Sequence, residues 1–344
     1  MKLKVRSRAP LRLGLAGGGT DVSPYSDEFG GCVLNATINM YAHTFIETLE
    51  EQDGILFEAR DLELSEKLAL DDDIANEGNL ILHRAVYKRV MEQFNNGKKI
   101  PLRVITYSDA PPGSGLGSSS TIVVSMLEAY KQLLSLPLGE YDLAHLAYEI
   151  ERIDCGLSGG KQDQYAATFG GFNFMEFYSN DRVIVNPLRI RRYIISELES
   201  SLILFFTGAS RDSAKIIEDQ VNSLSSDNGK RLASMHKVKD SAYRIKELLF
   251  KADIDSVAKE FRKSWVAKKA TSASITNEKI DRIEDDLMKS GAKSIKISGA
   301  GGGGFMMIFV EPEDKKNVLD VLKKHDGITH RFQFVEEGAY SWTI

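Results

Sequence analysis

The sequence predicts an α+β protein with two domains, and three observations support this prediction. The chain has 344 residues, of which 42% are hydrophobic, and this is more than one core of typical size accommodates. Short segments rich in β-branched and apolar residues occur in both halves, beside longer segments with helical periodicity. The boundary between the halves is expected near residues 185–200. We therefore assign residues 1–190 to an N-terminal domain and residues 191–344 to a C-terminal domain.

The N-terminal half is expected to combine strands with helices. Strands are predicted at residues 3–15, 33–49, 55–59, 102–107 and 172–178. Apolar residues at helical spacing predict helices at about 80–94, 118–135 and 140–153. A further short helix is expected after Gly159-Gly160, and Gly170-Gly171 ends it.

The C-terminal half is expected to be mainly helical between two groups of strands. A strand is predicted at 202–207, followed by helices over 213–290 with polar breaks near 225–229 and 252–255. Two strands (294–298 and 305–310), a helix (314–325) and two closing strands complete the chain.

Composition excludes several classes of protein. The net charge is −5 and no basic stripe with interleaved aromatic residues occurs, so nucleic acid is not an expected partner. The apolar runs are too short to span a membrane, and the basic N-terminus lacks the apolar region of a signal peptide. Cys32 and Cys155 are the only cysteines, which is typical of a reducing cytoplasm rather than of a disulfide framework. The six histidines lack zinc-site spacing.

The segment from Pro111 to Ser120 is the most informative part of the chain. Glycines at every second position allow the backbone to approach a ligand closely, and three serines follow at once. The loop leads into an amphipathic helix, whose free N–H groups and positive dipole end make an anion site. A triphosphate is the expected guest, with one serine hydroxyl available to Mg²⁺. The loop lacks the Lys-Ser or Lys-Thr pair of a Walker A motif; the alternative is a turn that merely starts a helix.

A second glycine-rich segment, Ser298 to Gly304, joins two predicted strands. Five of the six residues from 299 to 304 are glycine, more than a simple hairpin requires. Because each added glycine increases the entropy lost on folding, the segment predicts a close approach of backbone to a phosphate or to the facing glycine loop. The alternative is a flexible hairpin tip.

A third segment lies near the N-terminus and surrounds Gly17-Gly18-Gly19. Arg8 and Arg12 precede it, and Thr20 and Asp21 follow it. A carboxylate beside a hydroxyl suits sugar hydroxyls, whereas arginine binds phosphate oxygens bidentately. The alternative is a glycine-rich turn in which Thr20 and Asp21 cap a helix.

Two acidic residues fall in the middle of the chain. Asp163 lies in the first turn of a predicted helix, where a carboxylate is commonly a cap. Glu151 lies near the end of the preceding helix, where the dipole disfavours an acid, and this indicates a nearby cation. The string from Gly156 to Lys161 is no P-loop, because Gln162 replaces the required hydroxyl residue.

The three glycine segments, in this order, resemble those of the GHMP kinases, the family of galactokinase, homoserine kinase, mevalonate kinase and phosphomevalonate kinase. The string Pro-Pro-Gly-Ser-Gly-Leu-Gly-Ser-Ser-Ser at 111–120 carries the strongest match, and the resemblance extends from Arg8 to the last strands. It implies an N-terminal domain like ribosomal protein S5 domain 2 and a ferredoxin-like C-terminal domain, with ATP bound between them.

The resemblance also implies roles for individual residues. Asp163 corresponds to the catalytic base, Arg12 lies near the transferred phosphoryl group, and Ser119 and Glu151 hold Mg²⁺. The glycine-rich segment at 299–304 supports the phosphate loop and the substrate. The residues implied to bind ATP are Pro112, Gly113, Ser114, Gly115, Leu116, Gly117, Ser118, Ser119 and Ser120.

Within the family, the segments at 17–21 and 159–167 are similar to those of the kinases that phosphorylate the anomeric C1 hydroxyl of D-glycero-D-manno-heptose 7-phosphate. Their product, a 1,7-bisphosphate, leads to nucleotide-activated heptose for surface polysaccharides. Gly17-Gly18-Gly19 stands where galactokinases carry Glu-His, which argues against galactose. An L-fucose kinase and a non-catalytic sugar sensor remain as alternatives, and a decarboxylating relative is disfavoured.

A phosphorylated sugar requires its own cations. Arg8, Lys161 and the turn from Thr207 to Arg211 are the candidates for its phosphate; an ordinary capped loop is the alternative for that turn. A second copy of the same chain is also considered as a partner, which would form a homodimer. The residues expected to bind the sugar phosphate are Arg8, Gly18, Gly19, Thr20, Asp21, Lys161, Arg211, Gly301 and Gly302.

Overall fold

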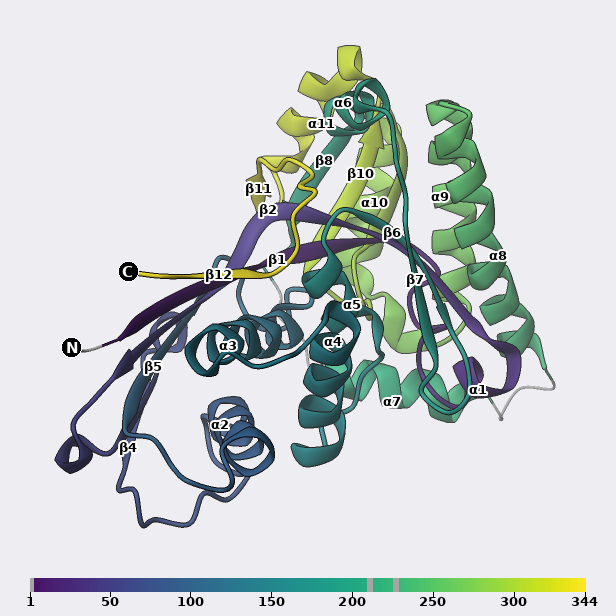
Figure 1. Cartoon of the computed structure of the whole chain (residues 1–344). Helices are drawn as coiled ribbons and strands as arrows, with labels where there is room; N and C mark the ends of the chain where they lie inside the picture. Colours follow the sequence, from purple (N-terminus) through teal and green to yellow (C-terminus); the bar gives the residue numbers. More distant parts are fainter. Residues whose placement is uncertain (1–2, 209–212, 225–228) are drawn as a thin grey trace.

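The structure is a computed structural model that describes residues 3–208, 213–224 and 229–344. Figure 1 shows two lobes, each with its own sheet, and both chain termini on the same lobe. The space-filling view has the same two lobes and is hydrophilic over much of its surface, as expected for a chain in which 27% of residues are charged. Among the described residues, no helix combines the length and the apolar character needed to cross a bilayer.

The first lobe contains an eight-stranded sheet in the described part of the chain. Its main path runs in the order β12-β1-β2-β5-β3-β4, while β6 pairs with β2 and β7 pairs with β6. Its strands are β1 (Lys4–Ala16), β2 (Gly31–Thr48), β3 (Ile55–Ala59), β4 (Leu64–Leu68), β5 (Leu102–Ser108), β6 (Phe172–Phe177), β7 (Val183–Pro187) and β12 (Tyr340–Thr343).

The long strand β2 shows how this sheet is covered. One edge of β2 pairs with β1, and the other pairs with β6 in its first half and with β5 in its second half. The first eight residues of β2 are all buried, whereas buried and partly exposed residues alternate after Asn39. The first half is therefore covered on both faces of the sheet, and the second half on one face only.

Helices cover one face of the first sheet (Figure 1). A core that includes Phe57, Val104 and Tyr130 lies between these helices and the strands. The helix predicted at 140–153 ends instead in one turn of π-helix, Ile150–Asp154, which carries Glu151. The helices are α1 (Tyr25–Phe29), α2 (Ile81–Phe94), α3 (Ser118–Leu134), α4 (Glu140–Glu149) and α5 (Gln162–Phe169), of which α1 lies apart from the rest.

The second lobe contains a four-stranded antiparallel sheet with the order β11-β8-β10-β9 in the described residues. Every residue of its central strand β10 is buried, because alternate side chains enter two different cores. Its strands are β8 (Leu202–Phe206), β9 (Ala292–Ile297), β10 (Phe305–Val310) and β11 (Ile328–His330). Its helices are α6 (Arg192–Ser201), α7 (Ser213–Leu224), α8 (Lys230–Phe250), α9 (Ile254–Lys269), α10 (Glu278–Lys289) and α11 (Lys315–Leu322).

One apolar core joins the two lobes. It brings Leu13 and Leu34 of the first sheet together with Phe261 of α9 and Phe309 of β10. The chain also returns to the first lobe at its end, where β12 pairs antiparallel with β1. The division at 190/191 falls between β7 and α6 and stays a prediction, since the closing strand lies in the sheet of the first lobe.

Candidate active site

A cavity of about 480 Å³ lies where the three glycine segments converge between the lobes. Its wall includes the loop before α3, the first turn of α5, the end of α9 and the segment after β9. Arg12, Ser119, Glu151 and Asp163 all line it, so residues from four distant parts of the sequence share one cavity.

The loop at 113–117 has the conformation that its glycines predict. Gly113, Gly115 and Gly117 have φ values of 69°, 80° and 78°, a region that other residues rarely adopt. These glycines line the cavity, whereas Leu116 is buried in the core and the hydroxyl of Ser114 is buried without a hydrogen-bond partner. Of the residues expected to bind ATP, Ser114 and Leu116 are not among those that line the cavity.

The segment at 299–304 packs directly against this loop. A Cβ on Gly115 would lie 2.4 Å from the Ser298 carbonyl oxygen, and a Cβ on Gly304 would lie 2.2 Å from the Ser114 carbonyl oxygen. The same Ser114 oxygen accepts a hydrogen bond from the Phe305 N–H at 2.8 Å. The prediction of a close backbone approach is confirmed, and the neighbour is the facing glycine loop.

Gly301 and Gly302 do not line the cavity, and their expected contact with substrate stays a prediction that this geometry does not support. The Gly302 N–H donates to the Ile275 carbonyl at 2.7 Å, and the Asn277 side chain donates to the Gly302 carbonyl at 2.9 Å. These contacts attach the segment to its own lobe, and Gly299 and Ala300 reach the cavity instead.

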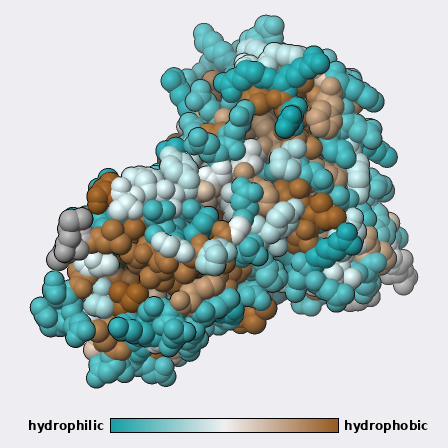
Figure 2. Space-filling model, viewed as in Figure 1, coloured by the Kyte–Doolittle hydropathy of each residue, from teal (hydrophilic) through white to brown (hydrophobic). Residues whose placement is uncertain are grey.

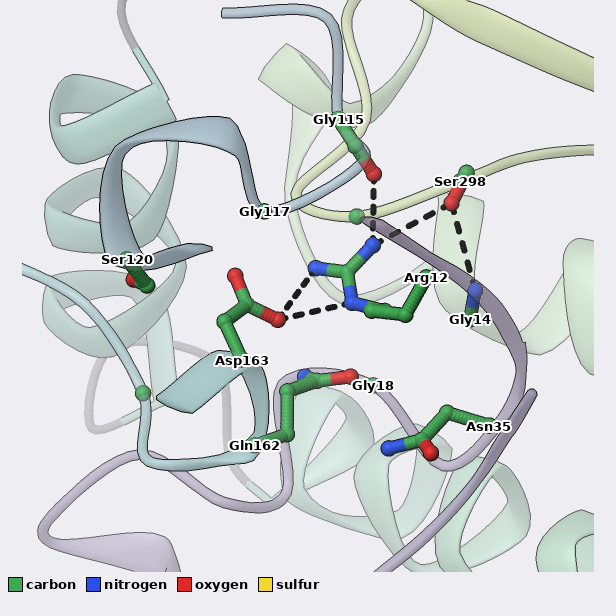
Figure 3. Close-up of polar contacts among 12 residues, drawn as sticks. Arg12, Gly14, Gly18, Asn35, Gly115, Gly117, Ser120, Gln162, Asp163 and Ser298 are labelled. Carbon is green, nitrogen blue, oxygen red and sulfur yellow. Dashed lines mark hydrogen bonds and ion pairs between the residues drawn. The ribbon is translucent and has the colours of Figure 1, made fainter. Parts of the chain in front are cut away.

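Asp163, in the first turn of α5, faces the glycine loop (Figure 3). Its Oδ1 accepts from Nε of Arg12 at 2.7 Å and lies 2.6 Å from the Nη2 atom of the same guanidinium. A Cβ on Gly117 would lie 3.0 Å from the carboxyl carbon of Asp163, so glycine is needed there for space as well as for φ. Arg12 is 3% exposed and also donates to the Gly115 carbonyl at 2.6 Å.

Glu151 is buried beside the start of α3. It accepts hydrogen bonds from the hydroxyls of Ser119 and Ser120 at 2.8 and 2.6 Å, from Gln164 Nε2 at 2.7 Å, and lies 3.2 Å from Arg152. No group of three or more His, Cys, Asp or Glu side chains suited to a metal occurs in the described chain. One carboxylate, one hydroxyl and phosphate oxygens nevertheless form a typical Mg²⁺ donor set, and Ser119 and Glu151 fit it.

Asp21 acts mainly as a cap for α5. Its carboxylate accepts from the Gly19 and Gln162 backbone N–H groups and from Gln162 Nε2, at 3.0 to 3.1 Å. A Cβ on Gly160 would lie 2.0 Å from this carboxylate, which explains the glycine there. Asp21 still lines the cavity, beside Gly19.

Thr20 does not line the cavity, and its expected contact with sugar stays a prediction that its hydrogen bonds do not support. Its hydroxyl donates to the carbonyls of Gly17 and Cys32 at 2.8 and 3.0 Å and accepts from the Cys32 N–H at 3.0 Å. The hydroxyl is therefore used to close the glycine turn onto β2. Of the alternative considered for this segment, a glycine-rich turn with a helix-capping Thr20-Asp21 pair, the turn is present and Asp21 alone caps a helix.

Two of the three cations expected for the sugar phosphate lie elsewhere. Arg8 lies over the rings of Tyr41 and Tyr340, at 4.5 and 4.9 Å from their centroids. Lys161 is buried and forms an ion pair with Asp181 at 2.6 Å. Neither lines the cavity, and each has its own partner elsewhere in the first lobe. The third, Arg211, lies outside the described residues.

The structure adds cavity-lining polar residues that the sequence did not single out, among them Lys268, Arg152, Gln162 and Gln220. Lys268 Nζ donates to the Gly18 and Gly299 carbonyls at 3.0 and 2.7 Å. Burial lowers the pKa of Lys268 to about 8, although the charge of Asp21 raises it. The sequence signals only a helix at Lys268. It also gives no sign that Arg152 packs against Gly159, where a Cβ would lie 2.3 Å from the Arg152 Cζ atom.

Comparison with known proteins agrees with this geometry. Residues 79–171 match the model of the GHMP kinases N terminal domain, and residues 245–327 match that of the GHMP kinases C terminal domain. The chain is 47% identical over 341 residues to D-glycero-alpha-D-manno-heptose 7-phosphate kinase of Campylobacter jejuni, covering 99% of each protein.

Solved structures give the same result. A D-glycero-D-manno-heptose 1-phosphate kinase from Bacteroides thetaiotaomicron superposes with a TM-score of 0.83 at 43% identity, over 99% of each chain. A galactokinase from Lactococcus lactis, complexed with galactose, superposes with a TM-score of 0.74 at 16% identity, over 98% of this chain and 94% of the other, and shows the fold alone. The resemblance inferred from the glycine segments and the two-domain fold that it implied are both confirmed.

Proposed function

The chain belongs to the GHMP kinase family, and we propose that it transfers the γ-phosphoryl group of ATP to the anomeric C1 hydroxyl of D-glycero-D-manno-heptose 7-phosphate. The observation that carries the choice of sugar is the 47% identity, over 99% of both chains, to the Campylobacter heptose 7-phosphate kinase. The 1,7-bisphosphate product would enter the synthesis of nucleotide-activated heptose for surface polysaccharides. We also propose a cytoplasmic location, since separate thiols such as Cys32 and Cys155 are typical of a reducing compartment.

The phosphates of ATP would bind at the glycine loop and the N-terminus of α3. Bare backbone at Gly113, Gly115 and Gly117 leaves N–H groups accessible, and the helix dipole favours negative charge at Ser118. Ser119 and Glu151 would hold Mg²⁺, which neutralises charge on the phosphate oxygens.

Asp163 would orient the acceptor hydroxyl and take its proton. Its Oδ1 is bound by Arg12, which leaves Oδ2 as the oxygen available for the proton. The guanidinium fixes the orientation of the carboxylate, and an anomeric hydroxyl is more acidic than an ordinary alcohol, which makes its proton easier to remove. Because phosphoryl transfer passes through a loose transition state, positioning by these groups accounts for most of the catalysis.

A sugar panel with ATP and Mg²⁺ tests the proposal. ADP release is measured with heptose 7-phosphate, heptose 1-phosphate, sedoheptulose 7-phosphate, mannose 6-phosphate, free heptose, L-fucose and galactose. Strong preference for heptose 7-phosphate, with a 1,7-bisphosphate product by ³¹P NMR, supports it. Preference for free heptose, L-fucose or galactose overturns the choice of sugar but keeps the kinase, and ATP binding without turnover on any sugar favours a sensor.

The turn at 207–211 is tested separately. Arg211→Ala is expected to raise the KM for heptose 7-phosphate and to leave the KM for ATP unchanged, if this turn binds the sugar phosphate. An unchanged KM for the sugar phosphate contradicts that role and leaves the overall reaction untouched.

A further inference from the structure

Two buried lysines of the second lobe bind the glycine segment at 17–19, which is the first along the chain, and the strand β1 that precedes it. Lys296 of β9 donates to the Gly14 and Leu15 carbonyls at 2.9 and 2.8 Å, and Lys268 of α9 donates to the Gly18 and Gly299 carbonyls. Both side chains belong to residues that are 2% exposed. Of these two lysines, only Lys268 lines the cavity.

Lys268 has one N–H donor that no described residue accepts. An ammonium group carries three N–H donors, and two of them are directed at carbonyl oxygens. No carboxylate among the described residues forms an ion pair with Lys268, although burying a charge without a partner is unfavourable. A ligand oxygen in the cavity would supply the missing acceptor.

The space beside Gly18 indicates which ligand this is. Gly18 is the one glycine of the 17–19 turn that does not have positive φ, so its backbone does not require glycine. A Cβ at this position would lie 3.6 Å from Lys268 Nζ and 3.7 Å from Gln162 Nε2, which are ordinary contact distances. The missing side chain therefore leaves room between two nitrogen donors, next to the first turn of α5 that carries Asp163. Gly18 itself is not among the residues that line the cavity, but Lys268, Gln162 and the neighbouring Gly19 are, so this space adjoins the cavity wall.

We propose that Lys268 binds the acceptor sugar, donating its third N–H to a sugar oxygen in the space beside Gly18. This inference rests on the proposed sugar kinase activity and names one residue of its acceptor site. The acceptor is favoured over the nucleotide because Gln162, which borders this space, directly precedes Asp163, and because Gly18 and Gln162 lie on the side of Asp163 opposite Ser120 (Figure 3). Its other two bonds hold the first and last glycine segments on either side of the sugar.

Lys268→Met and Lys296→Met form a matched pair of variants that tests this proposal. Both remove a buried ammonium that binds two carbonyls, so both are expected to lower Tm. Lys268→Met is expected to raise the KM for the sugar at least ~10-fold and to leave the KM for ATP within about threefold, since a hydrogen bond to a charged group contributes about 1.5–3 kcal/mol. Lys296→Met is expected to leave both KM values within about threefold.

Gly18→Ala tests the same space without removing a charge. The methyl group fits at ordinary contact distances, so Tm is expected to stay unchanged while the KM for the sugar rises. This variant decides the matter if Lys268→Met fails to fold. Equal sugar KM values in Gly18→Ala and wild type would overturn the proposal, as would a Lys268→Met protein whose sugar KM is unchanged or whose ATP KM rises instead.

The pH dependence of the KM for the sugar is a further test, because a lysine with a purely structural role would not change it. The charged groups acting on Lys268 are Asp21 of the first glycine segment and Arg12 of β1, and Lys296 of β9 in turn lies within electrostatic range of it. Because the pKa of Lys268 is about 8, the sugar KM of the wild type is expected to rise above that pH, and that of Lys268→Met to stay flat.

Calorimetric titration with the sugar alone tests the sugar contact of Lys268 separately from the proposed kinase activity. An inactive wild type in the sugar panel contradicts the proposed function. Weakened sugar binding in Lys268→Met, but not in Lys296→Met, supports the Lys268 site independently of turnover, and equal binding in all three proteins contradicts it.

Discussion

Arg12 and Asp163, which are 151 residues apart in sequence, meet through a single oxygen: both Nε and Nη2 of the guanidinium approach Oδ1 of the carboxylate. The remaining Nη1 group donates to the Gly115 carbonyl of the glycine loop and, at 3.3 Å, to the hydroxyl of Ser298. One side chain therefore connects the candidate base to two glycine segments and leaves Oδ2 of Asp163 without a hydrogen bond from any described residue (Figure 3).

Arg12→Lys tests this connection while keeping the charge. A lysine ammonium is a point charge and cannot reproduce the planar fork that contacts Asp163 and Gly115 together, so kcat is expected to fall at least ~10-fold. Steady-state kinetics measure it. Arg103→Lys is the control, because Arg103 also binds a carboxylate through Nε, at Glu58, but lies outside the cavity. Wild-type turnover in Arg12→Lys would show that charge alone suffices.

Asp163→Asn tests the base. The amide preserves the shape of the side chain but does not accept the proton of the acceptor hydroxyl, so kcat is expected to fall at least ~100-fold with little change in ATP affinity. Asp142→Asn is the control, since Asp142 also lies in the first turn of a helix and caps it through the Gly139 N–H. Single-turnover kinetics and ATP titration measure the two effects; undiminished turnover removes Asp163 from this role.

Glu151→Gln tests the proposed Mg²⁺ site. Loss of the carboxylate charge beside Ser119 is expected to raise the Mg²⁺ concentration for half-maximal rate at least ~10-fold, a typical effect of altering a metal environment. Glu149→Gln is the control, because Glu149 lies two residues earlier and binds Arg89 instead. An unchanged Mg²⁺ dependence in Glu151→Gln, measured at fixed ATP, would place the metal elsewhere.

The parts of the site that the sequence predicts well are those with local causes. Alternating glycines at 113–117 and the apolar spacing of the following helix both act within a few residues, and the structure has the loop and α3 where these patterns place them. The two strands around 299–304 follow from the same kind of local pattern. Short elements such as β7 and α6 have too few residues for a clear hydrophobic period, so their sequences do not predict them.

The parts that the sequence does not predict depend on distant partners. Lys268 is recognisable only through carbonyls 250 and 31 residues away. The sequence predicts two closing strands, but it does not predict that the last of them, β12, pairs with β1 from the other end of the chain. Thr20 and Asp21 could serve equally as sugar ligands or as caps in sequence terms. The structure favours the structural roles because the Cys32 N–H donates to Thr20 and the Gln162 N–H donates to Asp21. The whole fold determines where these two N–H groups lie.

Arg8→Met tests whether Arg8, which was expected to bind the sugar phosphate, lies outside the acceptor site as the structure places it. Since Arg8 lies over Tyr41 and Tyr340, its loss is expected to lower the free energy of unfolding by about 1 kcal/mol and to leave the KM for sugar and ATP within about twofold. Urea denaturation and steady-state kinetics measure these quantities. A tenfold rise in the sugar KM would return Arg8 to the acceptor site.

The buried His83 predicts how stability depends on pH. Burial lowers the pKa of His83 from 6.5 to about 4, only partly opposed by the charge of Glu66, and the ring bonds the Thr106 hydroxyl at 2.9 Å. The unfolded chain therefore binds a proton at this histidine in a range of pH where the folded protein does not. The stability contribution is full above pH 6.5, decreases as the pH falls toward 4, and changes no further below that.

His83→Gln isolates this contribution, because glutamine retains a hydrogen-bonding group for Thr106 but does not titrate. Between pH 7.5 and 5.0, the free energy of unfolding of the wild type is expected to fall by about 2 kcal/mol more than that of the variant, the equivalent of about 1.5 pKa units. Urea denaturation of both proteins at the two pH values measures the difference. Equal losses in the two proteins would mean that His83 is protonated in the folded state at pH 5.0, against the effect of its burial between α2 and β5.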